Sequence, residues 1–184
     1  TDNDPEHSRL FNRPWSERVE LRTRDTMRRN SLYEIRFHAR IVEGYTGPNG
    51  TFFQLHTGTK PALMFFVRSF GQTEWTAALM QGCSQSCNRN SDPEMQRYQR
   101  RATQGQSMRR WIEYRIVLDT GASPTMSVWI DGSPLIQNEA LVIPLGKEVY
   151  SRIGSYRSGD LDGQPTSVID YSMLEVTRLG PAPD

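Results

Sequence analysis

The stretch from Tyr150 to Arg157 carries side chains that could bind an anionic ligand and move a proton. In a β-strand, successive side chains point to opposite faces. Four residues of this stretch therefore share one face: Tyr150, Arg152, Gly154 and Tyr156. Arg152 would supply positive charge, Gly154 would leave room for a ligand, and Tyr156 would offer a titratable hydroxyl. An apolar core needs none of these, so the stretch indicates a concave surface for an anionic chain; an ordinary half-exposed strand is the alternative.

An amide and an imidazole occupy a second candidate strand, Thr51–Thr57. Gln54 and His56 are two residues apart and therefore share a face, with Phe53 and Leu55 on the opposite one. A single His on a strand usually serves the structure. A Gln beside it on the same face makes a pair that could hold a carboxylate and transfer a proton.

Three charged residues alternate along a third candidate strand, Ser16–Arg22. Arg18, Glu20 and Arg22 fall on one face, and two aliphatic residues fall on the other. Such a charged face is typical of a solvated outer surface. Beside the other two segments, it could instead line a groove for an anion.

The elements that must position these residues have the alternation of short β-strands. The longest run, Ser31–Val42, places five residues on its inward face: Tyr33, Ile35, Phe37, Ala39 and Ile41. Further strands are predicted at Pro61–Phe70, Thr73–Met80, Trp111–Leu118, Thr125–Ile130, Pro134–Gln137 and Val168–Arg178. Asp131-Gly132, between two of these strands, is a strong signal for a two-residue hairpin.

No segment has convincing helical periodicity, and about ten or eleven short strands are separated by turn signals. We therefore predict an all-β fold, a β-jelly roll sandwich of two curved antiparallel sheets. The 184 residues are enough for one domain with a sizeable core, covering residues 1–184. Only one face of each sheet must be apolar, which leaves a concave outer face for a substrate groove.

The composition narrows the classes of partner. The net charge is +1 and no apolar run is long enough to cross a membrane, so we expect neither nucleic acid nor a membrane as partner. Nearly all of the basic residues are Arg; only Lys60 and Lys147 are lysines. The planar guanidinium of Arg can bind a carboxylate through two N–H groups at once, which the Lys ammonium does less well. Cys83 and Cys87 could form a small loop disulfide in a secreted protein, or remain free thiols. The three histidines lack metal-ligand spacing, so we predict no metal site and no cofactor.

Two segments lack strand alternation. Residues Thr1–Trp15 are polar and contain two prolines, as expected for a lead-in strand or arm. The segment Gln81–Arg110 is rich in Arg and contains only two acidic residues. A connection of this length is usually functional or mobile. It could be a cationic lid over an anionic substrate or a plain flexible loop.

Three segments, in chain order, resemble the signature regions of the alginate lyases of polysaccharide lyase family 7. Arg18-Val19-Glu20-Leu21-Arg22 is similar to that family's Arg-x-Glu-Leu-Arg segment. Gln54-Leu55-His56 is similar to its Gln-Ile-His or Gln-Val-His triplet, and Tyr150–Ser158 to its Tyr-Phe-Lys-x-Gly-x-Tyr-x-Gln strand. The resemblance implies a β-jelly roll that acts on an anionic polysaccharide, and we expect a secreted or extracellular monomer.

The chain departs from the family pattern at several positions. Leu55 is neither of the usual middle residues, so the triplet does not indicate a preference for mannuronate or guluronate. Ser151, Arg152 and Ser158 replace Phe, Lys and Gln, which changes the floor expected to contact the sugar. Related jelly-roll lyases act on glucuronan or other uronates. The substrate expected is therefore alginate, with glucuronan or another polyuronate as the alternative.

The resemblance implies cleavage by β-elimination, in which the C5 proton is removed and the oxygen at C4 is expelled. Gln54 and Arg18 would neutralise the charge that builds on the carboxylate. Tyr156 would be both base and acid if the two groups leave on the same side of the ring. If they leave on opposite sides, His56 would be the base and Tyr156 the acid. Four further residues would contact or orient the substrate: Glu20, Arg22, Tyr150 and Arg152.

Two other functions are compatible with a β-sandwich. A glycoside hydrolase needs two carboxylates flanking the bond, and the acidic cluster on one strand that is usual in sandwich hydrolases is missing from the sequence. A carbohydrate-binding module would use exposed aromatic platforms instead. The four tryptophans could provide them: Trp15, Trp75, Trp111 and Trp129.

Overall fold

The computed structural model describes residues 16–23, 26–43, 50–56, 61–67, 75–80, 99–103, 109–141, 143, 148–158 and 168–183. Within them, residues 16–19, 43, 50, 66–67, 75–80, 99–103 and 156–158 are described by their backbone alone. The predicted arm Thr1–Trp15 and the two cysteines, Cys83 and Cys87, lie outside the described residues. The described part contains no helix long and apolar enough to cross a membrane.

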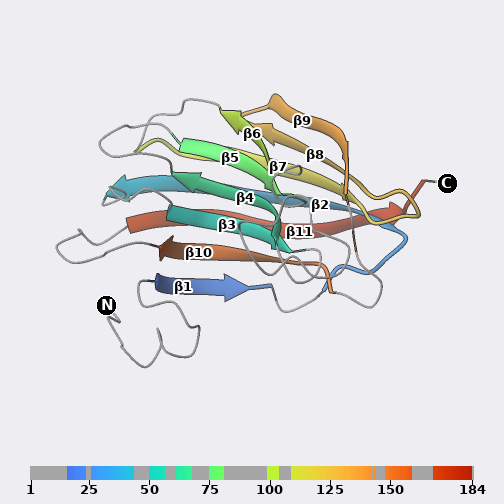
Figure 1. The fold of residues 1–184 in the computed structure, drawn as a ribbon, viewed down its shortest axis with the longest axis horizontal. Coiled ribbons are helices and arrows are strands. Elements are labelled where there is room, and N and C mark those ends of the chain that lie inside the picture. The colour runs from blue at the N-terminus through green and yellow to red at the C-terminus, as the bar shows by residue number, and fades with distance from the viewer. Residues whose placement is uncertain are drawn as a thin grey trace.

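The described residues form two antiparallel sheets that pack face to face (Figure 1). The first sheet has six strands in the order β1 (Ser16–Arg22), β10 (Tyr150–Ser158), β3 (Gly50–His56), β4 (Pro61–Val67), β5 (Trp75–Met80) and β6 (Gln99–Thr103). The second has five in the order β11 (Val168–Pro181), β2 (Ser31–Glu43), β7 (Ile112–Asp119), β8 (Thr125–Ile130) and β9 (Ser133–Ala140). The predicted all-β sandwich is confirmed.

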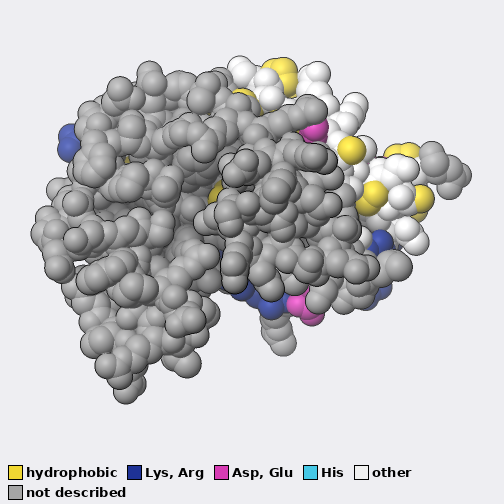
Figure 2. Space-filling model, viewed as in Figure 1, with side chains coloured by type: hydrophobic (Ala, Val, Ile, Leu, Met, Phe, Trp, Pro, Cys, Tyr) yellow, Lys and Arg dark blue, Asp and Glu magenta, His cyan; other side chains and the backbone are white. Residues whose placement is uncertain are grey.

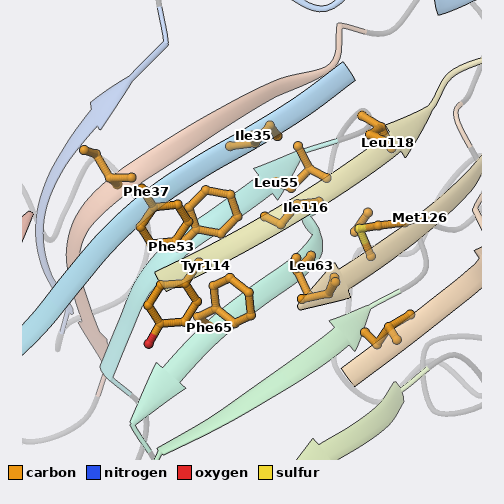
Figure 3. Packing of buried hydrophobic residues seen from close by; sticks show 14 of the residues in the cluster. Ile35, Phe37, Phe53, Leu55, Leu63, Phe65, Tyr114, Ile116, Leu118 and Met126 are labelled. Carbon is orange, nitrogen blue, oxygen red and sulfur yellow. The ribbon is translucent and has the colours of Figure 1, made fainter. Parts of the chain in front are cut away.

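The core lies between the two sheets, and the largest fully buried side chains described in it are aromatic rings (Figure 3). Phe37 of β2 stacks on Phe53 of β3, with the ring centroids 4.7 Å apart, so the contact joins the two sheets. Phe37 also stacks on Tyr114 of β7, again at 4.7 Å. Burying such a ring contributes about 1.5–3 kcal/mol to the free energy of unfolding. All five residues predicted to face inward from Ser31–Val42 are buried, which confirms the alternation.

The hairpin predicted at Asp131-Gly132 is present between β8 and β9. Asp131 has φ 47° and Gly132 has φ 73°, the positive values that a two-residue type I′ turn requires at both central positions. The Asp131 carboxylate also accepts the backbone N–H of Glu113 at 3.0 Å, which fastens the turn to β7.

The segment Gln81–Arg110 contains a strand that sequence alternation did not reveal. Gln99–Thr103 forms β6 and pairs with β5 at the end of the six-stranded sheet. An edge strand is held by backbone hydrogen bonds along one side, so its side chains need no apolar alternation. The prediction of one long loop is therefore wrong for these residues. Residues 81–98 and 104–108 lie outside the described part, and the proposed lid stays a prediction.

Candidate functional site

The three segments with candidate chemistry are neighbours in one sheet, although they lie far apart in the sequence. β1 pairs with β10, and β10 pairs with β3 (Figure 1). The strand registers place Arg22, Arg152 and Gln54 in one row across the three strands. In the next row of the same parity, Tyr150 of β10 is the partner of His56 of β3.

The opposite faces of β10 and β3 belong to the core. Ser151 and Ile153 of β10 are buried, and so are Phe53 and Leu55 of β3. Because side chains alternate along a strand, Tyr150 and Arg152 of β10 and Gln54 and His56 of β3 leave the sheet on the other face. The apolar alternation of the sequence thus sorts the polar residues of these two strands onto a common surface, as predicted.

A buried carboxylate begins a chain of hydrogen bonds across this surface. The Glu20 side chain is only 4% exposed, and its Oε1 accepts a hydrogen bond from Gln54 Nε2 at 2.6 Å. Gln54 Oε1 lies 2.8 Å from His56 Nε2. Gln54 and His56 are themselves buried, at 4% and 7% exposure. Residues from β1 and β3 are therefore joined into one polar unit across the intervening strand β10.

The chemistry of the three groups fixes the direction of each bond. An ionised carboxylate can only accept, so the Gln54 amide must direct its nitrogen to Glu20 and its oxygen to His56. The amide oxygen can in turn only accept, so the proton at this contact is on His56 Nε2. In a neutral imidazole this leaves the lone pair on Nδ1. Glu20 thereby determines the tautomer of His56 through Gln54.

Tyr150 packs against the imidazole and two guanidinium groups. Its ring stacks on His56 with 4.9 Å between the centroids and 3° between the planes. The Arg22 guanidinium lies 3.8 Å from the centre of the same ring. Arg152 is 5.3 Å from that centre, and its NH2 donates to the Tyr150 hydroxyl at 3.4 Å. These contacts limit the rotation of His56 and hold two cations beside it.

Arg152 and Arg22 each have a carboxylate partner. Arg152 NH1 lies 3.6 Å from Glu20 Oε2, and Arg22 forms an ion pair with Glu148. Figure 2 shows basic and acidic side chains side by side at the lower margin of the view, near the end of β1 in Figure 1. Glu148 was not predicted as part of the site. Its position two residues before Tyr150 was the signal, because residues two apart share a strand face.

The remaining two residues of the predicted catalytic set lie on the same strands. Arg18 of β1 and Tyr156 of β10 are Cα partners in the register. Their side chains are outside the described part of the structure. The structure thus brings together Gln54, His56 and the four residues predicted to contact substrate. It places the backbones of Arg18 and Tyr156 opposite each other, two residues beyond the pair of Glu20 and Gly154.

The charged face of β1 is buried at Glu20 and exposed at Arg22. Glu20 is nearly inaccessible, whereas Leu21, on the aliphatic face, is 73% exposed. β1 is the edge strand of its sheet, and its Leu21 side chain is not covered by the second sheet. The interpretation of Arg18, Glu20 and Arg22 as a solvated outer surface therefore fails for Glu20.

Two of the tryptophans proposed as binding platforms, Trp111 and Trp129, are described with their side chains. Both belong to the second sheet's side of the molecule. The Arg40 guanidinium lies 4.8 Å from the Trp111 ring centre, and Arg115 lies 4.7 Å from that of Trp129. Both rings are thus in contact with cations of the chain itself. Among the described residues, no group of three or more His, Cys, Asp or Glu side chains is placed to hold a metal ion.

Comparison with known proteins gives matches among solved structures only. No protein family matches the sequence, and no curated protein matches it. An alginate lyase from Pseudomonas aeruginosa superimposes with a TM-score of 0.60 at 19% identity, covering 88% of this chain and 74% of the other. An endo-β-1,4-glucuronan lyase from Trichoderma reesei gives 0.59 at 14% identity, covering 91% and 74%. A family 7 alginate lyase in complex with its product gives 0.62 at 14% identity, covering 89% and 72%.

These identities are too low to transfer an activity, but the superpositions extend over most of the chain. The overall fold is therefore shared with these enzymes. The chain has the β-jelly-roll fold of the family 7 alginate lyases and of glucuronan lyase.

Proposed function

We propose that the protein is a polysaccharide lyase that cleaves a uronic-acid-containing polymer by β-elimination. The observation that carries the proposal is the hydrogen-bonded unit of Glu20, Gln54 and His56 beside Arg22 and Arg152. An amide and an imidazole fixed in orientation next to cations are suited to a substrate carboxylate. The fold shared with alginate and glucuronan lyases supports the same reaction class.

The first requirement of β-elimination is to stabilise the negative charge that grows on the substrate carboxylate as C5 loses its proton. A side-chain amide has two N–H donors, and Gln54 directs one of them to Glu20. The other would donate to the substrate carboxylate, in a direction fixed by the first. A prearranged donor of this kind contributes on the order of 3 kcal/mol to transition-state stabilisation. Arg18, the register partner of Tyr156, would supply a second donor.

The second requirement is a base for the C5 proton and an acid for O4. His56 Nε2 is engaged with Gln54 Oε1, and Nδ1 is buried, so neither ring nitrogen faces an open surface. We therefore assign both proton transfers to Tyr156, in an elimination with both groups leaving on the same side of the ring. The phenolate form of a tyrosine needs cationic neighbours at neutral pH. Arg18, across from Tyr156 in the register, and Arg152 on the same strand are the candidates.

Alginate is the first substrate to test, and glucuronan is the second, because the matched structures include lyases for both polymers. Each elimination creates an unsaturated uronate, whose ultraviolet absorbance rises with turnover. A panel of alginate blocks, glucuronan, hyaluronan and heparin-type chains identifies the substrate and the reaction class together. Reducing ends that appear without this absorbance would contradict the proposal and favour a hydrolase.

The assignment of the proton carrier has its own test. Tyr156→Phe keeps the ring and removes the titratable hydroxyl, so turnover should fall to background while polymer still binds. Binding is measured by co-sedimentation or calorimetry with the polymer identified in the panel. A Tyr156→Phe protein that degrades the polymer at the normal rate would show that another group carries the proton.

A further inference from the structure

Tyr171 connects the second sheet to the backbone underneath the candidate site. It lies on β11 opposite Ala39 of β2, whose side chain is buried in the core, and it packs against that core. Its hydroxyl reaches across to the first sheet and accepts the backbone N–H of Gly154 at 3.1 Å. The same oxygen lies 2.7 Å from the carbonyl oxygen of Phe52 and 2.9 Å from that of Gly154, to either of which it can donate its proton.

Both backbone partners of this hydroxyl lie at bulges. The register between β10 and β3 shifts between Ile153 and Tyr156, so β10 carries one extra residue there. Gly154, inside this interval, has φ 140°, a conformation that favours glycine. The register between β3 and β4 shifts between Thr51 and Phe53, so Phe52 is the extra residue of β3.

A bulge leaves the backbone of its extra residue without regular ladder partners. Backbone polar groups in a partly buried place must find hydrogen bonds elsewhere. The Tyr171 hydroxyl meets this need for two bulges at once, because a hydroxyl both donates and accepts. The two irregularities and the tyrosine thus form a single structural unit.

The bulge in β10 sets the position of the proposed acid and base. Ile153 pairs with Phe53, and an unbroken register would pair Tyr156 with Gly50. With the extra residue, Tyr156 pairs with Thr51 instead. The bulge therefore brings Tyr156 one residue nearer to Gln54 along β3, a difference of about 3.4 Å.

The bulge in β3 sets the faces of the residues around it. Phe52 and Phe53 are consecutive, yet both are buried in the core and both contact the ring of Phe65, at 5.9 Å and 5.4 Å between centroids. Two consecutive core residues reset the alternation of the strand. The bulge at Phe52 therefore determines that the Gln54 side chain, two residues later, lies on the face of the site.

We propose that Tyr171 is a positioning residue for the lyase reaction. Its hydroxyl holds the paired bulges of β3 and β10, and these fix Gln54 and Tyr156 relative to each other. The inference rests on the proposed function. It assigns a role in turnover to a side chain that approaches the sheet from the core side and does not touch substrate.

The test is Tyr171→Phe, which keeps the ring in the core and removes only the hydroxyl. We expect kcat to fall by ~10–100-fold, the loss typical of a misplacement of about 1 Å between reacting groups. KM for the polymer should stay within roughly twofold, because the cations Arg22 and Arg152 are held by other contacts. Hydrogen exchange at the Gly154 amide should become faster in the same variant.

Ser127→Ala is the matched control. Ser127 Oγ accepts the backbone N–H of Asn138 at 2.8 Å, and Asn138 lies at the bulge of β9 with φ 48°. The change thus removes a hydroxyl that supports a bulge at the opposite end of the second sheet from β11. Both variants should lower Tm, and only Tyr171→Phe should lower kcat.

The outcomes separate the two proposals. If the wild type is active and Tyr171→Phe has an unchanged kcat, or loses no more than Ser127→Ala, the positioning role is overturned and the proposed function stands. If the wild type cleaves no polymer in the panel, the proposed function fails, and the role of Tyr171 in turnover fails with it. Faster exchange at Gly154 together with a selective loss of kcat supports the proposal.

Discussion

Glu20 on β1 and Glu34 on β2 both stand among arginines on an alternating strand, but they have different partners. Glu34 lies on the outer face of the second sheet, 2.7 Å from Arg36 Nε and 2.5 Å from Arg115 Nε. Burial raises the pKa of Glu34, but the hydrogen bonds and charges of Arg115 and Arg36 outweigh it and hold that pKa below its usual value. Among the described residues, both of these partners of the carboxylate are therefore guanidinium groups.

Glu20 lies 3.6 Å from the Arg152 guanidinium, and it also has a neutral partner, the Gln54 amide at 2.6 Å. The amide has a second functional end, and it passes the orientation on to His56. The comparison indicates when a charged residue on an alternating strand becomes part of a site. Its partner on another strand must be a group, such as an amide, that can orient a further side chain. A guanidinium that only neutralises it leaves a structural ion pair.

Breaking the relay at Gln54 should have the largest effect of the changes that test this comparison. Gln54→Ala removes the donor to the substrate carboxylate and the group that fixes His56. We expect kcat to fall by ~10²–10³-fold, as for the loss of one prearranged donor. The rate of ultraviolet absorbance increase on the substrate measures it.

Glu34→Gln serves as the control for Gln54→Ala, since it alters the outer carboxylate and should leave kcat unchanged. A Gln54→Ala enzyme that keeps a kcat within roughly threefold of wild type would remove Gln54 from the mechanism. A large loss in Glu34→Gln would show that the two faces are not independent.

Much of this arrangement followed from alternation in the sequence. The inward residues of Ser31–Val42, the hairpin at Asp131-Gly132 and the shared face of Gln54 and His56 are properties of period-two strands and of one turn type. Each depends on neighbours in the chain. Such features can be predicted without knowledge of which strands pair.

The features that could not be predicted depend on which strands pair with each other. Glu20 could not be told from Glu34, because its burial comes from Gln54 and Arg152 on other strands. β6 was missed because an edge strand needs no apolar alternation. The bulge at Gly154 was hidden as well: a glycine in a strand signals either a gap for ligand or a bulge, and only the register distinguishes them.

A smaller effect is expected when the charge of Glu20 is removed and its shape is kept. In Glu20→Gln the new amide can donate or accept, so Gln54 is no longer obliged to direct its nitrogen to β1, and the tautomer of His56 is released. We expect a ~10-fold lower kcat, equivalent to about 1.4 kcal/mol. The ¹⁵N chemical shifts of His56 should show a mixture of tautomers.

Glu34→Gln is again the matched variant for Glu20→Gln, with the same chemical change on the other sheet. It should leave the His56 shifts as in the wild type. If Glu20→Gln keeps both the wild-type shifts and the wild-type kcat, the carboxylate does not control the imidazole.

The smallest effect concerns the stability supplied by Glu34 and its dependence on pH. Its pKa is lower in the folded protein than in the unfolded chain, so its ionised form stabilises the fold. This contribution is fully present above the unfolded pKa of ~4.3 and is lost as the pH falls through the lower folded value. A partly exposed ion pair of this kind contributes on the order of 1 kcal/mol or less. Urea unfolding of wild type and Glu34→Gln should therefore differ by that amount at pH 7 and pH 5.5, and the difference should shrink toward zero at pH 3. A difference that is constant over this range, or that grows on acidification, would mean that Arg36 and Arg115 do not stabilise the charge of Glu34, and the contrast with Glu20 would lose its electrostatic basis.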